Sequence, residues 1–220
     1  MSIVENLDKI KNSLPENVTL VAVSKTKPVT DLMEAYNAGQ RIFGENKIQE
    51  MVDKFEQMPK DIQWHMIGHV QSNKVKFMAP FVSLIHGVDS LKLLQEINKQ
   101  ALKNNKIIDC LLQIFIAKED TKFGLDEEEL KSLLESEEFK QLKNIRITGL
   151  MGMATFTENQ SQIEKEFRYL KEIFDTYKIV SADNCQIVTL SMGMSGDYQL
   201  ATECGSTMVR IGSSIFGGRS

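Results

Sequence analysis

The sequence predicts a (β/α)8 barrel, and three observations support this fold class. Short apolar runs alternate with amphipathic stretches along almost the whole chain, which favours parallel strands connected by helices. Eight such runs occur within 220 residues, a number that favours a closed barrel over an open, doubly wound sheet. No linker, repeat or low-complexity segment divides the chain. We therefore expect residues 1–220 to form a single α/β domain.

The expected strands are runs of apolar and β-branched residues that end near proline, glycine or polar residues. The fifth run is apolar almost throughout, as in a strand that is buried on both faces. The eight strands are expected at residues 20–27, 41–43, 63–68, 81–86, 107–116, 145–151, 186–190 and 208–211.

The expected helices have apolar residues at spacings of three and four, so that these residues share one face. In the first helix, at 2–14, this face holds Ile3, Leu7, Ile10 and Leu14. Potential capping residues precede some of the others, such as Ser90 and Asp126. The remaining helices are expected at about 31–38, 46–57, 71–77, 91–102, 126–134, 160–177 and 197–203.

Composition excludes several classes of protein. Charged residues make up 25% of the chain and the formal net charge is -4, so there is no electrostatic case for nucleic-acid binding. The three cysteines have no spacing that suggests disulfides or a zinc site, which favours a reducing cytoplasm. The amino terminus does not resemble a signal peptide, and no apolar run approaches the roughly 20 residues of a membrane span. We expect a cytoplasmic monomer, with a weak dimer as the alternative.

Lys25 is the first candidate for a functional residue. The apolar run before it should end near Lys27, because Pro28 has no N–H and forces its neighbour out of helical geometry. Lys25 would then lie at the carboxyl end of a buried strand, where barrels bind their ligands. Apolar surroundings disfavour an ammonium group, and the free amine could form a Schiff base. The alternative is a surface lysine that merely follows a strand.

The loops after the seventh and eighth strands are candidates for an anion site. Ser191, Gly193 and Ser195 follow one strand, and Gly212 and Ser213 follow the other. Loops at these two positions of a barrel commonly bind phosphate through backbone N–H groups and hydroxyls.

Arg210 should point into the mouth of the barrel, because it precedes Gly212 by two residues. A buried guanidinium needs an acceptor there, and the alternative to a ligand is a salt bridge to a carboxylate such as Glu45. Lysine, arginine and a phosphate site together predict a phosphorylated carbonyl ligand. A sugar phosphate aldolase and a pyridoxal phosphate protein both meet that description.

The histidines do not predict a metal site. His65 and His69 are four residues apart, but Gly68 lies between them at the end of a strand, which argues against a helical ligand pair. We expect His65 to be a hydrogen-bonded residue of the barrel.

Six motifs occur in order over most of the chain, and together they resemble the pyridoxal phosphate homeostasis protein family. They are Ala-Val-Ser-Lys-Thr-Lys-Pro at 22–28, Phe-Gly-Glu-Asn at 43–46, Trp-His-Met-Ile-Gly at 64–68, Gly-Leu-Met at 149–151, Ser-Met-Gly-Met-Ser at 191–195 and Gly-Ser-Thr-Met-Val-Arg-Ile-Gly at 205–212. That family is similar to the barrel domain of alanine racemase, a fold-type III pyridoxal phosphate enzyme, but lacks its second domain.

The resemblance implies roles for individual residues. Lys25 would carry pyridoxal 5'-phosphate (PLP) as a Schiff base, with Asn46 beside it. The phosphate ligands would be Ser191, Ser195 and the residues after Arg-Ile-Gly, namely Gly212 and Ser213, where the family often has threonine at the latter position. Arg210 would face the pyridine nitrogen. The stretch from Lys118 to Gly124 keeps the family's Lys-x-Gly ending at Lys122 but varies before it, which affects only the expected shape of the rim.

The resemblance also favours a carrier over an enzyme. A racemase of the alanine type uses the cofactor lysine and a tyrosine from a partner's second domain, and this chain stops at Ser220. An arginine at the pyridine nitrogen would keep that nitrogen unprotonated and weaken the cofactor as an electron sink. We therefore expect a non-enzymatic protein that holds, buffers or delivers PLP, with apo PLP-dependent enzymes as candidate recipients. A weakly active amino acid racemase is the alternative, and a phosphosugar aldolase the third.

Overall fold

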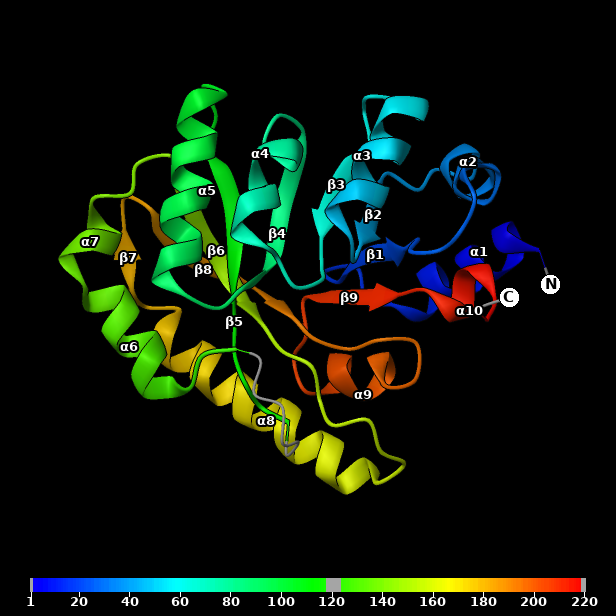
Figure 1. Ribbon diagram of the computed structural model, residues 1–220. Helices are drawn as coiled ribbons and strands as arrows, with labels where there is room; N and C mark the ends of the chain where they lie inside the picture. Colours follow the sequence, from blue (N-terminus) through cyan, green and yellow to red (C-terminus); the bar gives the residue numbers. More distant parts are fainter. Residues whose placement is uncertain (1, 118–123, 219–220) are drawn as a thin grey trace.

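The computed structural model describes residues 2–117 and 124–218, which form a closed barrel of eight parallel strands (Figure 1). Neighbouring strands follow chain order from β1 to β6, after which β6 pairs with β8, β8 with β9, and β9 with β1. The predicted barrel is thereby confirmed. The eight strands are β1 (Thr19–Val23), β2 (Ile42–Glu45), β3 (Gln63–Met66), β4 (Val82–Val88), β5 (Ile108–Gln113), β6 (Ile145–Met151), β8 (Cys185–Ser191) and β9 (Met208–Ile211).

Three of the strands end earlier than the sequence predicts, and one of them, β3, stops at Met66 rather than at residue 68. The first was expected to reach residue 27, but β1 stops at Val23 because the chain turns, and Lys27 N donates to Ser24 O at 3.1 Å. The fifth was expected to reach residue 116, but after Gln113 the chain leaves the sheet and forms only an isolated bridge from Ile114 to Leu125. A further short strand, β7 (Ser181–Ala182), pairs antiparallel with β8 and was not predicted.

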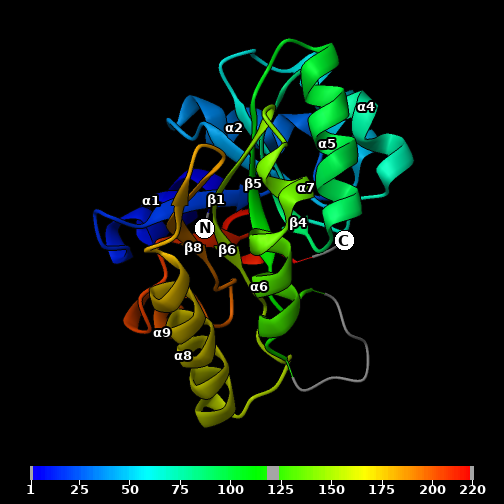
Figure 2. The ribbon, with the colours of Figure 1, turned by 90° about the vertical axis from the view of Figure 1, so that its left-hand side faces the viewer.

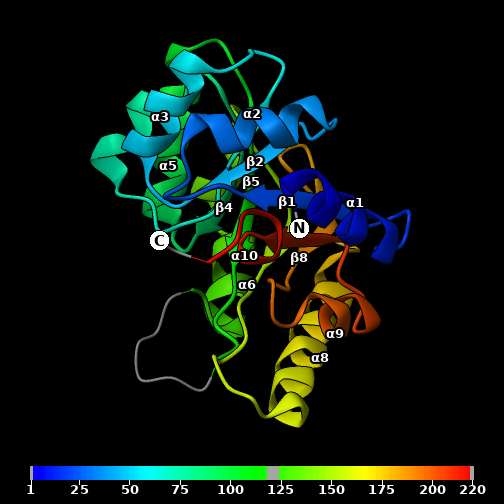
Figure 3. The same cartoon turned by 90° about the vertical axis from the view of Figure 1, so that its right-hand side faces the viewer.

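The helices form an outer layer around the strands. Figure 2 looks onto α6 and α8, which lie side by side in this layer, and Figure 3 shows α1 beside α10. Asn6 Nδ2 of α1 donates to Ile215 O of α10 at 3.1 Å, which ties the two helices together. The helices are α1 (Ile3–Ser13), α2 (Val29–Asn37), α3 (Ile48–Gln57), the 3₁₀ turn η1 (Ser72–Lys74), α4 (Val75–Met78), α5 (Leu91–Lys103), α6 (Glu127–Glu135), α7 (Glu137–Lys140), α8 (Gln160–Tyr177), α9 (Tyr198–Glu203) and α10 (Ser213–Phe216).

Side chains alternate across each strand and so build two separate cores. Those that point outward pack against the helices, and the largest of them are Phe43 and Trp64, both fully buried. Those that point inward fill the barrel, where a small apolar cluster includes Val21, Leu111 and Met208. Because successive residues of a strand face opposite sides, the parity of a position decides whether it supports the helices or faces the barrel interior. No helix in the described ranges combines the length and apolar character needed to cross a lipid bilayer.

Candidate functional site

A cavity of about 740 Å³ opens at the carboxyl ends of the strands. Its wall comes from the ends of β1, β2, β3, β5, β6, β8 and β9 and from the loops that follow them. Parallel strands all end at the same face of a barrel, so residues that are far apart in sequence meet here. Six of the seven predicted site residues line this cavity: Lys25, Asn46, Ser195, Arg210, Gly212 and Ser213.

Lys25 reaches the cavity because of the geometry at the end of β1. Ser24 N still donates to Gly44 O at 3.0 Å, so the ladder between β1 and β2 continues to that residue. Val23 and Lys25 share the inward-facing parity of the strand, and both line the cavity. Lys27 lines it as well, and its Nζ donates to Gly218 O at 2.8 Å. The sequence interpretation of a strand-end lysine is therefore supported, while its chemical role remains a prediction.

Arg210 is held in the cavity wall by two hydrogen bonds. Its side chain is buried on β9, and it donates to Ser191 Oγ at 2.6 Å and to Gly152 O at 3.1 Å. Burial lowers the pKa of Arg210 to about 10, while the charge of Asp197 opposes that shift. The guanidinium therefore stays protonated at neutral pH and can only donate hydrogen bonds.

The suggested salt bridge between Arg210 and Glu45 is wrong. Glu45 faces away from the barrel interior, towards α3, and pairs with Lys54 at 2.7 Å. Parity explains the difference, because Gly44 faces the barrel interior beside Val21, and its neighbour Glu45 must face the opposite side. The described hydrogen-bond acceptors of Arg210 are therefore neutral, and the nearby charge that acts on it is that of Asp197.

Ser191 lies beneath the cavity rather than on its wall. It is fully buried, and its hydroxyl accepts the hydrogen bond from Arg210. His86 Nδ1 lies 3.1 Å from the same oxygen, and His86 Nε2 lies 3.0 Å from His65 Nδ1. The predicted direct contact between Ser191 and a ligand therefore gives way to a supporting position under Arg210.

The two histidines of this buried row are neutral. Burial lowers the pKa of His65 to about 3. The pKa of His86 lies well below its usual 6.5 because of burial first, and then because of His65 and the positive charge of Arg210. Since Arg210 only donates, the hydroxyl hydrogen of Ser191 can go to His86, whose Nε2–H can then donate to His65. The row places neutral, hydrogen-bonded polar groups directly below Arg210.

The loop after β8 and the end of β9 bring several donors to one point. Gly193 has φ +98°, and a Cβ there would meet Ala201 Cβ at 2.6 Å, so the turn requires glycine. Ser195 Oγ accepts from Gly212 N at 3.2 Å and from Ser214 N at 3.4 Å. Backbone N–H groups that converge on one acceptor in this way form the kind of concavity that binds anions.

Asp197 is an acidic residue of the same wall that sequence reasoning missed. Its Oδ1 accepts from Met194 N at 2.6 Å, which closes the turn of this loop. Burial raises the pKa of Asp197, an effect that the hydrogen bond from Met194 and the charge of Arg210 oppose. The loop Ser-Met-Gly-Met-Ser ends just before this residue, so a motif search does not include it.

The remaining predictions concern the rim at residues 118–123, metal binding and the cysteines. The segment 118–123, with Lys118 and Lys122, lies outside the described residues, so the expected shape of that part of the rim stays a prediction. Within the described ranges, no group of three His, Cys, Asp or Glu side chains is arranged to hold a metal ion. The three cysteines are buried and free.

Comparison with known proteins agrees with this arrangement. Residues 1–220 match the family described as the alanine racemase N-terminal domain. A pyridoxal phosphate homeostasis protein of Haemophilus influenzae is 40% identical over 99% of this chain and 92% of its own length. A protein of the same name from Aquifex aeolicus is 40% identical over 91% of this chain and 86% of its own.

Solved structures extend the comparison to the fold. PipY of Synechococcus elongatus, in a structure with PLP bound, is 33% identical, with a TM-score of 0.88 over 98% of this chain and 100% of that one. Alanine racemase of Clostridium difficile is 17% identical, with a TM-score of 0.78 over 99% of this chain and 56% of that one, and shows the shared fold. On its sequence relatives and its barrel, this chain belongs to the family of the pyridoxal phosphate homeostasis proteins, within the wider alanine racemase N-terminal domain family.

Proposed function

We propose that this protein binds PLP in the cavity and acts without catalysis of its own in PLP homeostasis, by holding, buffering or delivering the cofactor. The observation that carries the proposal is that Lys25 after β1, the Ser195 hydroxyl after β8 and the buried Arg210 on β9 line the same cavity, where Gly212 N and Ser214 N converge on that hydroxyl. The family's homeostasis proteins and the PLP-bound structure of PipY support the same ligand. Three free, buried cysteines support a reducing compartment, the cytoplasm.

The phosphate of PLP fits the point at which the donors converge. Gly212 N and Ser214 N already share one acceptor, the hydroxyl oxygen of Ser195. A phosphate oxygen is a stronger acceptor than a hydroxyl, and rotation of Ser195 would turn that hydroxyl into a further donor. Ser213 lines the cavity next to these groups and can add another hydroxyl. The donor set is suited to a dianion and unsuited to a cation.

Lys25 fits the aldehyde of the same ligand. When bound, PLP supplies an aldehyde carbon that condenses with a free amine and releases one molecule of water. Lys25 follows β1, which pairs directly with β9, so it lies across a strand boundary from Gly212 and Ser213. Asn46, at the end of the neighbouring β2, lines the wall on the other side of Lys25. The lysine is thus placed to hold the ligand at the end opposite the phosphate.

Arg210 fits the ring nitrogen and supports a role without catalysis. A protonated guanidinium can donate to the pyridine nitrogen only while that nitrogen is an unprotonated acceptor. Ser191 and Gly152 hold the guanidinium in place, so it cannot easily turn away. An unprotonated ring withdraws electrons poorly, and proton removal from an amino acid would gain little from it. The relatives' names likewise describe homeostasis proteins and not enzymes.

We expect PLP to become attached to Lys25. Purified protein is incubated with PLP, reduced with borohydride, freed of unbound ligand and digested for peptide mapping by mass spectrometry. The phosphopyridoxyl mass should appear on the peptide that contains Lys25, and Lys25→Met should lose it while Lys27→Met keeps it. Wild-type protein that acquires no label, or that carries it on Lys27 alone, would contradict the proposed attachment.

We also expect the PLP-loaded protein to be a poor racemase. Alanine is incubated with it in deuterated water, and exchange of the α-proton is followed by NMR, with free PLP at the same concentration as the control. The charge of Arg210 opposite the ring should keep the exchange rate close to that of free PLP. Exchange that is much faster than this control would favour the alternative of an amino acid racemase.

A further inference from the structure

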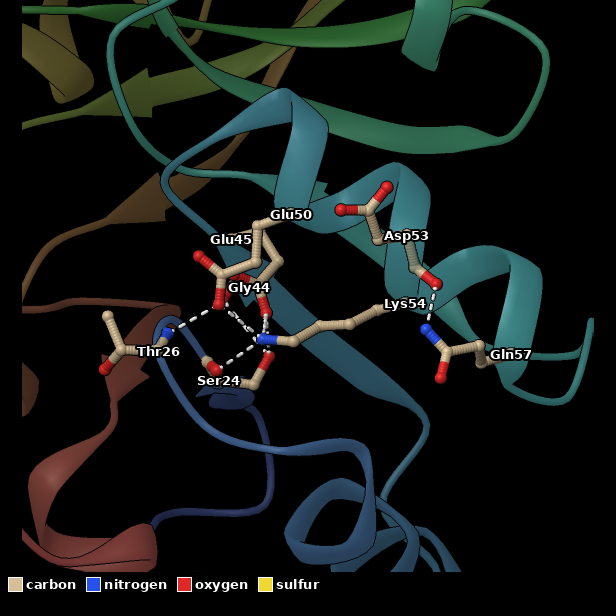
Figure 4. A network of polar contacts seen from close by, with 8 residues as sticks. All are labelled: Ser24, Thr26, Gly44, Glu45, Glu50, Asp53, Lys54 and Gln57. Carbon is tan, nitrogen blue, oxygen red and sulfur yellow. Dashed lines mark hydrogen bonds and ion pairs between the residues drawn. The ribbon is translucent and has the colours of Figure 1, made fainter.

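Lys54 is a buried lysine on the inner face of α3. Only 5% of it is exposed, and it shares this face with Ile48 and Met51, at spacings typical of core residues. Buried lysines are rare unless their charge is paired and their donors are satisfied. This one lies beside the carboxyl ends of β1 and β2, where it contacts Ser24 and Glu45 (Figure 4). Neither Lys54 nor Glu45 is among the residues that line the cavity.

All three hydrogen-bond donors of Lys54 are used. Nζ donates to Glu45 Oε1 at 2.7 Å, to Glu50 Oε1 at 2.7 Å and to Ser24 O at 2.8 Å (Figure 4). The ammonium group therefore joins two carboxylates from β2 and α3 to the backbone at the end of β1.

The two carboxylates in turn hold the residues on either side of Lys25. Ser24 Oγ donates to Glu45 Oε1 at 2.6 Å, and Thr26 N donates to Glu50 Oε1 at 2.6 Å. The other carboxylate oxygen of Glu45 is buried and has no hydrogen-bond partner among the described residues. The carboxylate of Glu45 thus directs all of its described hydrogen bonds towards Lys54 and Ser24 at the end of β1.

Thr26 needs such a restraint because its backbone is in the left-handed region, with φ +64°. A β-branched residue disfavours this conformation, which persists only where the surroundings enforce it. The bond from Thr26 N to Glu50 is charge-assisted and therefore strong for its type. The strained turn sets the direction in which the chain presents the preceding residue, Lys25.

We propose that Lys54 is a positioning residue that fixes the turn around Lys25 by holding Glu45 and Glu50 against Ser24 and Thr26. This inference rests on the proposed function for its meaning, since it concerns the residue that would carry PLP. In the ligand-free protein, the same network should keep the turn rigid whether or not PLP binds. The two statements are tested separately.

The first experiment measures the ligand-free protein by amide hydrogen exchange. Lys54→Met removes the charge but keeps the length of the side chain, and Asp53→Asn on the same helix is the control, because Asp53 bonds only to Gln49 and Gln57 among the described residues. The Thr26 amide should exchange at least about tenfold faster in Lys54→Met, since its acceptor Glu50 is no longer held in place. Unchanged protection of Thr26 would overturn the inference.

A second pair of variants covers the case in which Lys54→Met does not fold, because it leaves the buried Glu45 unpaired. Glu50 is partly exposed, with 24% of its side chain accessible, so its replacement should be tolerated. Glu50→Ala removes the acceptor of Thr26 N, whereas Glu50→Gln keeps an oxygen in that place. Faster exchange in the alanine variant with near-normal exchange in the glutamine variant supports the inference. Equal exchange in both variants contradicts it.

The second experiment measures PLP itself, by titration followed by borohydride reduction. Glu50→Ala and folded Lys54→Met should raise the apparent dissociation constant of PLP about tenfold, because ordering about one residue of the turn then accompanies binding. Part of the phosphopyridoxyl label fixed by borohydride should appear on Lys27 instead of Lys25. Normal affinity and labelling in these variants would overturn the inference about Lys54 and leave the proposed function standing. A wild-type protein that takes up no PLP would instead overturn the proposed function, while the exchange experiment would still decide on the network.

Discussion

Replacing Gly149 by alanine should destabilise the barrel more than any other single methyl group added to a glycine. A Cβ at this position would lie 1.9 Å from Thr189 O, a backbone atom of the neighbouring strand β8. Gly149 pairs with Thr189 beside an irregularity in the register between β6 and β8. The clash can be relieved only by separating the two strands, so we expect a loss of about 3 kcal/mol in the free energy of unfolding, at the upper end of the usual cost of overpacking.

Urea unfolding followed by circular dichroism measures this effect. Gly196→Ala is the matched control, because a Cβ there has no neighbour within 4 Å. Its unfolding midpoint should stay within the small range that is typical of surface substitutions. If Gly149→Ala unfolds at the same urea concentration as wild type, Gly149 does not pack against Thr189 in the pairing of β6 with β8.

Acid should destabilise the protein through the two buried histidines. Their pKa values are lowered in the folded state, to about 3 for His65 and well below 6.5 for His86, while both return to about 6.5 on unfolding. Below pH 6.5 the unfolded chain therefore binds protons that the folded chain does not. Stability is present above 6.5 and falls as the pH drops, by up to about 1.4 kcal/mol per histidine and pH unit.

Urea unfolding at a series of pH values between 7 and 4.5 tests this expectation. The comparison is with the double variant His65→Asn, His86→Gln, whose buried amides do not titrate. Glu45 has a raised pKa, caused first by burial, and contributes a slope of the opposite sign, but it does so in both proteins. The double variant should have a lower free energy of unfolding at pH 7 than the wild type. Its free energy of unfolding should also fall less as the pH is lowered. Equal slopes in the two proteins would show that the histidines do not control the acid response.

Most of the fold could be predicted because its elements have strong periodicity. All eight barrel strands and the long helices, such as α5 and α8, lie where apolar spacing places them. The elements that escaped prediction are short. A two-residue strand such as β7 and four-residue helices such as α7 and α10 contain too few residues to show a period. They depend on contacts that form only in the folded chain.

The site was predictable to the extent that strand ends define it. Counting to the end of each strand was enough to bring Lys25, Asn46 and Arg210 to one cavity. Depth within the barrel was not predictable, because alternation tells which side a residue faces but not which layer it occupies. Ser191 was expected to contact the ligand, yet Arg210 donates to its hydroxyl, and Arg210 rather than Ser191 lines the cavity.

The polar network behind the site left a signal that sequence reasoning did not use. Ile48, Met51 and Lys54 recur at intervals of three on the buried face of α3, so a charged residue occupies a core position. A lysine at such a position predicts a buried carboxylate as its partner. Glu45, at the end of the preceding strand, is that carboxylate. Which carboxylate pairs with which cation depends on the face of the strand, and the alternative that paired Glu45 with Arg210 put Glu45 on the wrong side.

The pairing of the first strand with the last has a consequence for how the ligand and the folding of the chain are connected. Thr19 in β1 pairs with Met208 in β9, and this junction separates Lys25 from Gly212 and Ser213. During synthesis the lysine emerges early and the anion-binding groups emerge last. A ligand that contacts both can bind only a chain whose two ends have already joined.

The supply of ligand should therefore act as a check on completed folding. Binding to the closed barrel alone stabilises it by about 2.7 kcal/mol when the free ligand exceeds its dissociation constant a hundredfold. Chains that are truncated or still incomplete gain none of this stabilisation. In a cell short of the ligand, the amount of intact protein would fall together with the amount of ligand that needs to be stored.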